Sequence, residues 1–174
     1  MKKIVMYMHG GSGNHGCEAI INSTCNMVET PVAVLSARTE EDRKYSLKDL
    51  CEIYQERNVT SNIWIHGVYY FLKKILRQRD VYARYRFKDI LKTDCQTYLS
   101  VGGDNYCYDS MIEELVEANR MLTASGKKTV LWGCSIEPEL LKSSDIREDL
   151  QRYSMIVARE SITYDALLSA GIKH

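Results

Sequence analysis

The residues best suited to chemistry lie in a glycine-rich turn near the start of the chain, His-Gly-Gly-Ser-Gly-Asn-His-Gly-Cys-Glu over 9–18. An apolar run precedes the turn and a helical pattern follows it, so free backbone N–H groups and the positive end of the helix dipole would face it. Glycine lets the backbone approach a ligand without a Cβ in the way. We expect the turn to bind an anionic part of a substrate through Gly11, Gly13, Asn14 and Gly16. The same residues also fit a tight strand-to-helix connection with a purely structural role.

Proton-handling groups stand on this turn and on a second loop. His15 and Glu18 are placed to orient or deprotonate a hydroxyl group. The second loop, Gly-Gly-Asp-Asn-Tyr over 102–106, follows an apolar strand pattern, and Asp104 could act on the same hydroxyls. We expect this loop to bind substrate through Gly102, Gly103, Asn105 and Tyr106. The other interpretation is a tight turn that its own Asx side chains hold.

Arg159 directly follows a short apolar strand pattern, which would place it at the carboxyl end of that strand. The planar fork of an arginine suits a carboxylate or a phosphate. We expect Arg159 to hold the charged groups of a substrate and Ser161 to contact it from the start of the next helix, which it would cap. A surface pair with Glu160 is the alternative role for Arg159.

The elements that must position these residues alternate between strand and helix. We expect strands at 3–8, 31–36, 50–54, 96–101, 129–132 and 155–158, and helices at 18–28, 68–77, 81–91, 110–124, 144–152 and 161–170. Ser110 and Glu113 have the spacing of a capping box for the fourth helix, whereas 37–62 shows little pattern. This alternation predicts an α/β fold, a Rossmann-like parallel sheet with helices on both faces. Loops 9–18, 102–108, 133–138 and 159–161 should then meet beyond the carboxyl ends of the strands.

The glycine turn also matches the dinucleotide fingerprint Gly-x-Gly-x-x-Gly in its spacing and its strand–turn–helix setting. The end of the next strand offers Ser36 and Arg38 instead of the acidic residue that holds a ribose. An oxidoreductase that uses a 2′-phosphorylated cofactor is therefore one alternative function.

Composition narrows the classes of partner. The 174 residues carry 23 basic and 23 acidic side chains, so no overall field attracts nucleic acid, and we expect none as a partner. No apolar run has the roughly 20 residues of a membrane span, and no secretory leader is visible, which predicts a cytoplasmic protein, with the inner face of the membrane as a possible site. The six cysteines form no Cys-x-x-Cys pair, so we expect no metal.

Residues 69–92 form a basic, aromatic stretch with eight Lys or Arg and two Asp. We expect a tyrosine-rich helical insertion at about 63–92. Two interpretations remain open: a peripheral contact with a membrane, an anionic glycan carrier or RNA through 69–92, and a solvated helical hairpin whose tyrosines pack inward.

Four motifs together resemble the polysaccharide pyruvyl transferase family. They are the opening His-Gly-Gly-Ser-Gly-Asn-His-Gly-Cys-Glu-Ala-Ile, Leu-Ser-Val-Gly-Gly-Asp-Asn-Tyr-Cys-Tyr at 99–108, Leu-Trp-Gly-Cys-Ser-Ile-Glu-Pro at 131–138 and Ile-Val-Ala-Arg-Glu-Ser-Ile-Thr-Tyr at 156–164. The resemblance implies transfer of a pyruvyl group from phosphoenolpyruvate to two hydroxyls of a sugar or lipid-linked saccharide, forming a ketal on a bacterial cell-surface polysaccharide or its precursor. Phosphoenolpyruvate is then a donor substrate, and no cofactor is expected.

The resemblance also implies a domain organisation. Residues 1–174 correspond to the N-terminal half of a glycosyltransferase-B-like two-domain fold, so we expect the second domain to be absent from this chain and the chain alone to be inactive. Two other functions remain open, a related enzyme that uses a nucleotide-sugar and a non-catalytic carbohydrate-binding domain. The oligomeric state and the acceptor sugar stay undetermined.

Overall fold

A six-stranded, wholly parallel sheet forms the centre of the molecule in the computed structural model, which describes residues 3–58, 62–75 and 81–173. The strand order is β3-β2-β1-β4-β5-β6. The strands are β1 (Lys3–His9), β2 (Val32–Ser36), β3 (Glu52–Gln55), β4 (Cys95–Val101), β5 (Lys128–Cys134) and β6 (Met155–Ala158). This order places the point where the connections reverse between β1 and β4. The predicted α/β, Rossmann-like class is confirmed.

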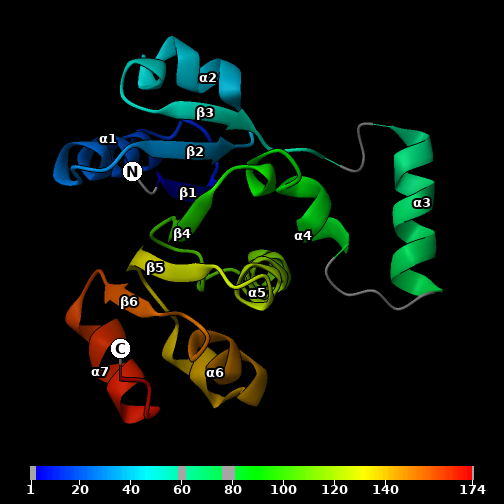
Figure 1. Cartoon of the computed structure of the whole chain (residues 1–174). Coiled ribbons are helices and arrows are strands. Elements are labelled where there is room, and N and C mark those ends of the chain that lie inside the picture. The colour runs from blue at the N-terminus through cyan, green and yellow to red at the C-terminus, as the bar shows by residue number, and fades with distance from the viewer. Residues whose placement is uncertain (1–2, 59–61, 76–80, 174) are drawn as a thin grey trace.

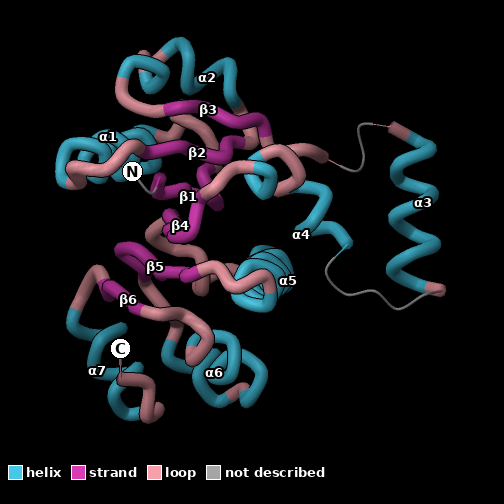
Figure 2. Tube along the Cα trace, viewed as in Figure 1, coloured by secondary structure: helices cyan, strands magenta, loops and turns pink. Residues whose placement is uncertain are grey.

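Helices connect successive strands, as Figures 1 and 2 show. They are α1 (His15–Met27), α2 (Thr39–Lys44), α3 (Ile63–Lys74), α4 (Val81–Arg86), α5 (Asp109–Ala124), α6 (Ser144–Leu150) and α7 (Ser161–Ser169). The described residues also form short 3₁₀ helices, which are η1 (Leu47–Asp49), η3 (Ile90–Lys92) and η4 (Pro138–Lys142). None of the helices within the described ranges combines the length and the apolar character that crossing a membrane requires.

Both faces of the sheet are buried. Val5 and Tyr7 of β1 pack into one apolar cluster with residues of α4, α5, α6 and α7, whereas Met6 between them packs into a second cluster with Ile21 of α1. This alternation follows from the two-residue period of a strand. A sheet covered on both faces is a rigid frame, so the loops at the carboxyl ends of its strands have a fixed base.

The element boundaries differ from the sequence-based prediction at several points. Residues 37–62 contain α2, η1 and β3, and the predicted strand 50–54 lies slightly later, as β3. The predicted helix 81–91 ends at Arg86, and the chain then turns near Asp89, which forms a two-bond ion pair with Arg57. The end of the predicted helix 68–77 lies outside the described residues.

Two predicted helix caps are wrong. α5 begins at Asp109 with Tyr108 at its N-cap position, so Ser110 lies inside the helix and does not hold the N-cap position that the predicted capping box requires. α7 begins at Ser161, and Glu160, in an extended conformation, holds the N-cap position. The N-cap position of α5 lies two residues before Ser110, and that of α7 lies one residue before Ser161.

Candidate active site at the carboxyl edge of the sheet

Arg159, Asp104 and Gly103 come together at the carboxyl edge of the sheet. The Arg159 Nη2 donates to Asp104 Oδ1 at 2.7 Å, and its Nε lies 3.5 Å from Glu160. A Cβ on Gly103 would overlap the Arg159 guanidinium, so this close approach depends on glycine. Hydrogen bonding to Asp104 raises the pKa of Arg159. Arg159 and Asp104 are both about half exposed, which leaves the pair accessible to a ligand.

Backbone hydrogen bonds tie three of the predicted loops to one another. Ser135 donates its backbone N–H to the carbonyl of Gly103, and Arg159 donates its own to the carbonyl of Cys134. The Ser135 hydroxyl also donates to Glu160 at 2.8 Å. Hydrogen bonds from Thr163, Ser135 and Arg159 lower the pKa of Glu160. The loops that follow β4, β5 and β6 therefore form one connected platform under Arg159, and these are three of the four loops predicted to meet at this edge.

Asn105 holds the turn below this platform from inside. Its side chain is buried and donates to the carbonyl of Val101 at 3.2 Å and to the Ser100 hydroxyl at 3.4 Å. It fills the space beside Gly102, which has φ +134° and no room for a Cβ. Gly102 is therefore needed for the shape of the turn, and the Asn105 amide faces the protein interior.

Tyr106 also points inward, into a buried polar network. Its hydroxyl donates to Asp149 Oδ2 at 2.6 Å and lies 3.2 Å from the Tyr153 hydroxyl. Asn119 donates to the other Asp149 oxygen at 3.0 Å and accepts from the Thr129 hydroxyl. Burial raises the pKa of Asp149, although these hydrogen bonds oppose the shift. The network anchors the loop after β4 to α6, and the Tyr106 ring does not reach the surface.

Side chains of the chain itself accept hydrogen bonds from several backbone N–H groups of the glycine turn. Ser12 donates its N–H and its hydroxyl to Asp42 Oδ1, at 2.9 and 2.7 Å, and Gly13 donates its N–H to Glu41 at 3.0 Å. Cβ atoms on Gly11 or Gly13 would lie 2.7 or 2.6 Å from a Glu41 oxygen. These glycines make room for the carboxylates of α2, at the place where a dinucleotide phosphate would bind.

Asn14 and Gly16 form the start of α1. Asn14 is the N-cap residue, and its Oδ1 accepts from the backbone N–H of Gly16 at 2.9 Å and of Cys17 at 3.4 Å. Arg38, the candidate partner for a 2′-phosphate, instead pairs with Glu41 at 3.2 Å. Both observations weaken the oxidoreductase alternative, because Arg38 and several of the N–H groups that would bind the cofactor's phosphates already have partners.

His9 and Asp42 form a fully buried pair behind the glycine turn. His9 Nε2 lies 2.8 Å from Asp42 Oδ1, and both side chains are excluded from solvent. Burial raises the pKa of Asp42, but hydrogen bonds, first that from His9, outweigh burial and hold it at about 2. The pair ties the end of β1 to α2 and fixes the conformation of the turn.

His15 and Glu18 lie one turn apart on the first part of α1. His15 Nδ1 is 3.0 Å from Glu18 Oε2, and the imidazole packs edge-on against Tyr45 with ring centroids 5.4 Å apart. With Nδ1 donating to the carboxylate, Nε2 carries the lone pair and can accept a proton. The His15 side chain is 73% exposed, so it can meet a substrate.

The sequence-predicted site residues thus divide into three groups. Arg159, Asp104, His15 and Glu18 present side chains at the surface in two pairs, which make no hydrogen bond or ion pair with each other in the described part of the chain. Ser161 is exposed at the start of α7, beside Glu160. The remaining residues shape the backbone or anchor it: Gly11, Gly13, Asn14, Gly16, Gly102, Gly103, Asn105 and Tyr106.

Sequence reasoning missed Glu41 and Asp42. The dinucleotide fingerprint predicts an acidic ribose-binding residue only at the end of β2, where the chain has Ser36 and Arg38. The two carboxylates lie in the first turn of α2, three and four residues after Arg38. The Thr-Glu-Glu-Asp stretch at 39–42 is visibly acidic, but nothing local to it indicates a contact with the glycine turn. Among the residues that the structure describes, no three His, Cys, Asp or Glu side chains gather as metal ligands would.

Comparison with known proteins assigns the family. The model of the family described as polysaccharide pyruvyl transferase matches residues 26–174 of the 174-residue chain. The matched stretch contains Gly102, Gly103, Asp104 and Arg159 and begins after the glycine turn. Searches of curated proteins and of solved structures found no match. The family match spans most of the chain, and the chain therefore belongs to the polysaccharide pyruvyl transferase family.

Proposed function

We propose that the chain takes part in transfer of a pyruvyl group from phosphoenolpyruvate to two hydroxyls of a sugar, forming a ketal and releasing phosphate. The acceptor would be a saccharide, free or lipid-linked, that is built into a cell-surface polysaccharide. Family membership supports a transferase of this kind. The strongest support from the structure is the solvent-accessible ion pair between Arg159 and Asp104. This pair lies on the platform formed by the loops that follow β4, β5 and β6. The donor is already activated, so the reaction as proposed uses no separate cofactor.

The chemistry needs three kinds of group. A proton must reach the methylene carbon of phosphoenolpyruvate, which leaves C2 electrophilic. The first sugar hydroxyl then bonds to C2 and gives up its proton, and the second forms another C2–O bond as the C2–O bond to phosphate breaks. Positive charge must hold the donor carboxylate or phosphate, and a base must accept hydroxyl protons.

Arg159 is the group that we assign to the donor. Its guanidinium carries five N–H donors. One of the N–H groups on Nη2 donates to Asp104. A donor carboxylate can form two parallel hydrogen bonds with such a fork. We propose that the donor carboxylate replaces Asp104 on Arg159. The freed Asp104 carboxylate would then accept a hydrogen bond from an acceptor hydroxyl.

His15 is the second candidate base. Glu18 holds Nδ1, and the exposed Nε2 would accept the proton of the attacking hydroxyl. β1 and β4 are neighbouring parallel strands, so the turn that leads to His15 and the loop that carries Asp104 leave the same edge of the sheet. The glycine turn would fix the position of His15, because the carboxylates of α2 and the Asn14 cap hold it.

Incubation of the native protein, purified as the cell produces it, with phosphoenolpyruvate and a panel of sugars and lipid-linked sugars tests the proposal. Phosphate release and the mass of the acceptor are measured together. The proposal expects phosphate release that depends on the acceptor and a product heavier by one pyruvyl ketal. A parallel incubation replaces phosphoenolpyruvate with nucleotide-sugars. Glycosyl transfer in that incubation, with no pyruvyl product from phosphoenolpyruvate, would contradict the proposal.

A further inference from the structure

Helix α3 stands apart from the rest of the molecule. Figure 1 shows it beyond α4, at the side of the molecule away from the sheet. None of its residues is buried. Two contacts fix its inner side: the Tyr69 ring packs against Tyr82 of α4 with centroids 5.7 Å apart, and Lys73 donates to Glu113 of α5 at 2.9 Å. The opposite side of α3 therefore faces solvent.

The solvent-facing side of α3 carries a continuous apolar stripe. Trp64, Val68, Phe71 and Ile75 follow one another at intervals of three or four residues, which places them on one face of a helix. Their exposed fractions are 82, 60, 49 and 63%. We call these four residues the α3 stripe. Large apolar side chains gathered in this way mark a surface that another molecule covers.

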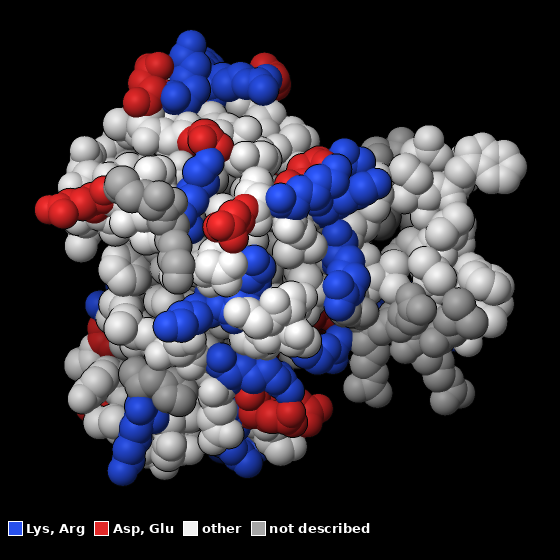
Figure 3. All heavy atoms as spheres, viewed as in Figure 1, with Lys and Arg blue, Asp and Glu red and all other residues white. Residues whose placement is uncertain are grey.

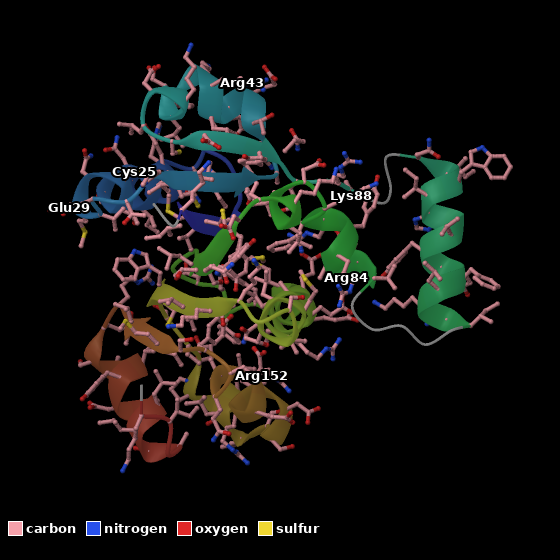
Figure 4. All side chains as sticks on the ribbon, viewed as in Figure 1. Cys25, Glu29, Arg43, Arg84, Lys88 and Arg152 are labelled. Carbon is pink, nitrogen blue, oxygen red and sulfur yellow. The ribbon has the colours of Figure 1, made fainter. Side chains whose placement is uncertain are left out.

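Charge indicates which kind of molecule covers the stripe. α3 has no acidic residue, and its last turn carries Lys73 and Lys74. Exposed Arg84 and Lys88 extend from α4 and the turn after it, on the side of the molecule where α3 stands, as Figure 4 shows. In the view of Figure 3 the visible face of α3 is mostly uncharged, and basic side chains lie beside it. Basic side chains next to an apolar stripe complement a surface that is negative outside and apolar within.

An apolar hollow between α3 and α4 borders the α3 stripe and shares Trp64 and Val68 with it. Residues of α3 and α4 enclose about 330 Å³ between them, lined by Trp64, Ile65, Val68, Tyr69, Leu72, Val81 and Tyr85. The hollow is open to solvent and has almost no polar lining. An acyl chain can occupy such a space, whereas a charged protein segment would lose its hydration there.

We propose that α3 docks on an anionic lipid bilayer, with the α3 stripe among the acyl chains and the flanking basic residues at the headgroups. The interfacial position suits Trp64, whose ring is amphipathic. This inference rests on the exposure and charge of α3 and does not depend on the reaction proposed above. If both proposals hold, the docked chain would lie where a lipid-linked acceptor is found.

Vesicle flotation with the purified chain tests the proposal. One set of vesicles contains phosphatidylcholine alone, and the other also contains phosphatidylglycerol. We expect the chain to float with the anionic vesicles, and the double variant Trp64→Ser, Phe71→Ser to lose about tenfold or more in binding. The matched control is Met27→Ser with Ile162→Ser, two side chains on α1 and α7 that are 69% and 68% exposed.

Each outcome decides the question. Flotation of wild type and control, but not of the α3 double variant, supports lipid docking. Failure of the folded wild-type chain to float with anionic vesicles overturns it, as does equal flotation of the α3 double variant. Sedimentation in the absence of lipid tests whether a second copy of the chain covers the stripe instead. If wild type self-associates but does not float, and the double variant does not self-associate, the stripe is a contact between copies of the chain and lipid docking is overturned. Circular dichroism confirms that each variant is folded.

Discussion

The guanidinium of Arg159 lies directly against the backbone of Gly103, in the space that a Cβ at that position would fill. The two residues come from the ends of different strands, and hydrogen bonds among the loops after β4, β5 and β6 fix their approach. Glycine at 103 therefore positions the arginine, and with it the Asp104 ion pair, at the carboxyl edge of the sheet.

Gly103→Ala should lower pyruvyl transfer and leave the fold nearly unchanged. The new methyl group would displace the Arg159 guanidinium, which is the far end of a flexible side chain and can move at little cost. We expect a loss of about tenfold or more in kcat/KM, because a misplaced group close to the reacting atoms is costly. The matched control is Gly67→Ala, where nothing lies within 4 Å of the new Cβ. Equal activity in the two variants would show that the Arg159 position does not matter.

Asp104→Asn should separate donor binding from turnover. The amide removes the negative partner of Arg159, so the donor carboxylate meets less competition and the KM for phosphoenolpyruvate should fall or stay unchanged. The same change removes a base for the acceptor hydroxyl, and kcat should fall by about a hundredfold. Steady-state kinetics with varied phosphoenolpyruvate measures both. A raised KM with an unchanged kcat would contradict the exchange of Asp104 for the donor on Arg159.

Acid should weaken the structure through Asp42. Its pKa is held at about 2 in the folded protein, below the ordinary 3.8, so the folded state binds fewer protons than the unfolded state between these values. The stabilisation is complete above about pH 4 and is lost as the pH falls towards 2, an effect of about 2 kcal/mol. Urea unfolding at a series of pH values measures it.

Two neutral variants test this role of Asp42. Asp42→Asn removes the buried charge, and Glu40→Gln is the matched control. Asp42→Asn should be less stable at neutral pH and should show a flatter acid dependence than wild type. Glu40 is 85% exposed, and its pair with Arg43 contributes little, so Glu40→Gln should follow the wild-type curve. Identical curves for wild type and Asp42→Asn would rule out a stabilising role for the His9–Asp42 pair.

Tyr106→Phe should destabilise the fold without touching the substrate. The change removes the 2.6 Å hydrogen bond to Asp149 and leaves that buried carboxylate without one of its donors. We expect a loss of about 2 kcal/mol in the free energy of unfolding. Tyr164→Phe is the matched control, since Tyr164 is 57% exposed on α7. An unchanged stability together with a higher KM for either substrate would instead indicate that Tyr106 contacts the substrate.

The sheet, and the edge at which its loops meet, could be predicted from the sequence because apolar strands and amphipathic helices alternate along it. The strand at 155–158 has the predicted boundaries, and the loops that follow β4, β5 and β6 meet as the parallel order requires. α2 could not be predicted in the same way. Its sequence Thr-Glu-Glu-Asp-Arg-Lys is short and has no apolar face to give a helical period.

The roles of two predicted site residues depend on contacts far along the chain. Tyr106 turns inward because Asp149, 43 residues later, accepts its hydroxyl hydrogen bond. The glycine turn receives Glu41 and Asp42 from about 30 residues away, and no local pattern shows that these carboxylates fill it. A glycine indicates a close approach, but the sequence around it does not say whether a ligand or a side chain makes that approach.

The most direct test of the proposed site is pyruvyl transfer by Arg159→Ala beside Arg43→Ala. Both arginines are exposed and paired with a carboxylate, so neither change should cost more than about 1 kcal/mol in stability. We expect Arg159→Ala to lose transfer by about a hundredfold or more, with a raised KM for phosphoenolpyruvate, and Arg43→Ala to keep wild-type rates. Wild-type turnover in Arg159→Ala would contradict the assignment of the donor to this edge of the sheet.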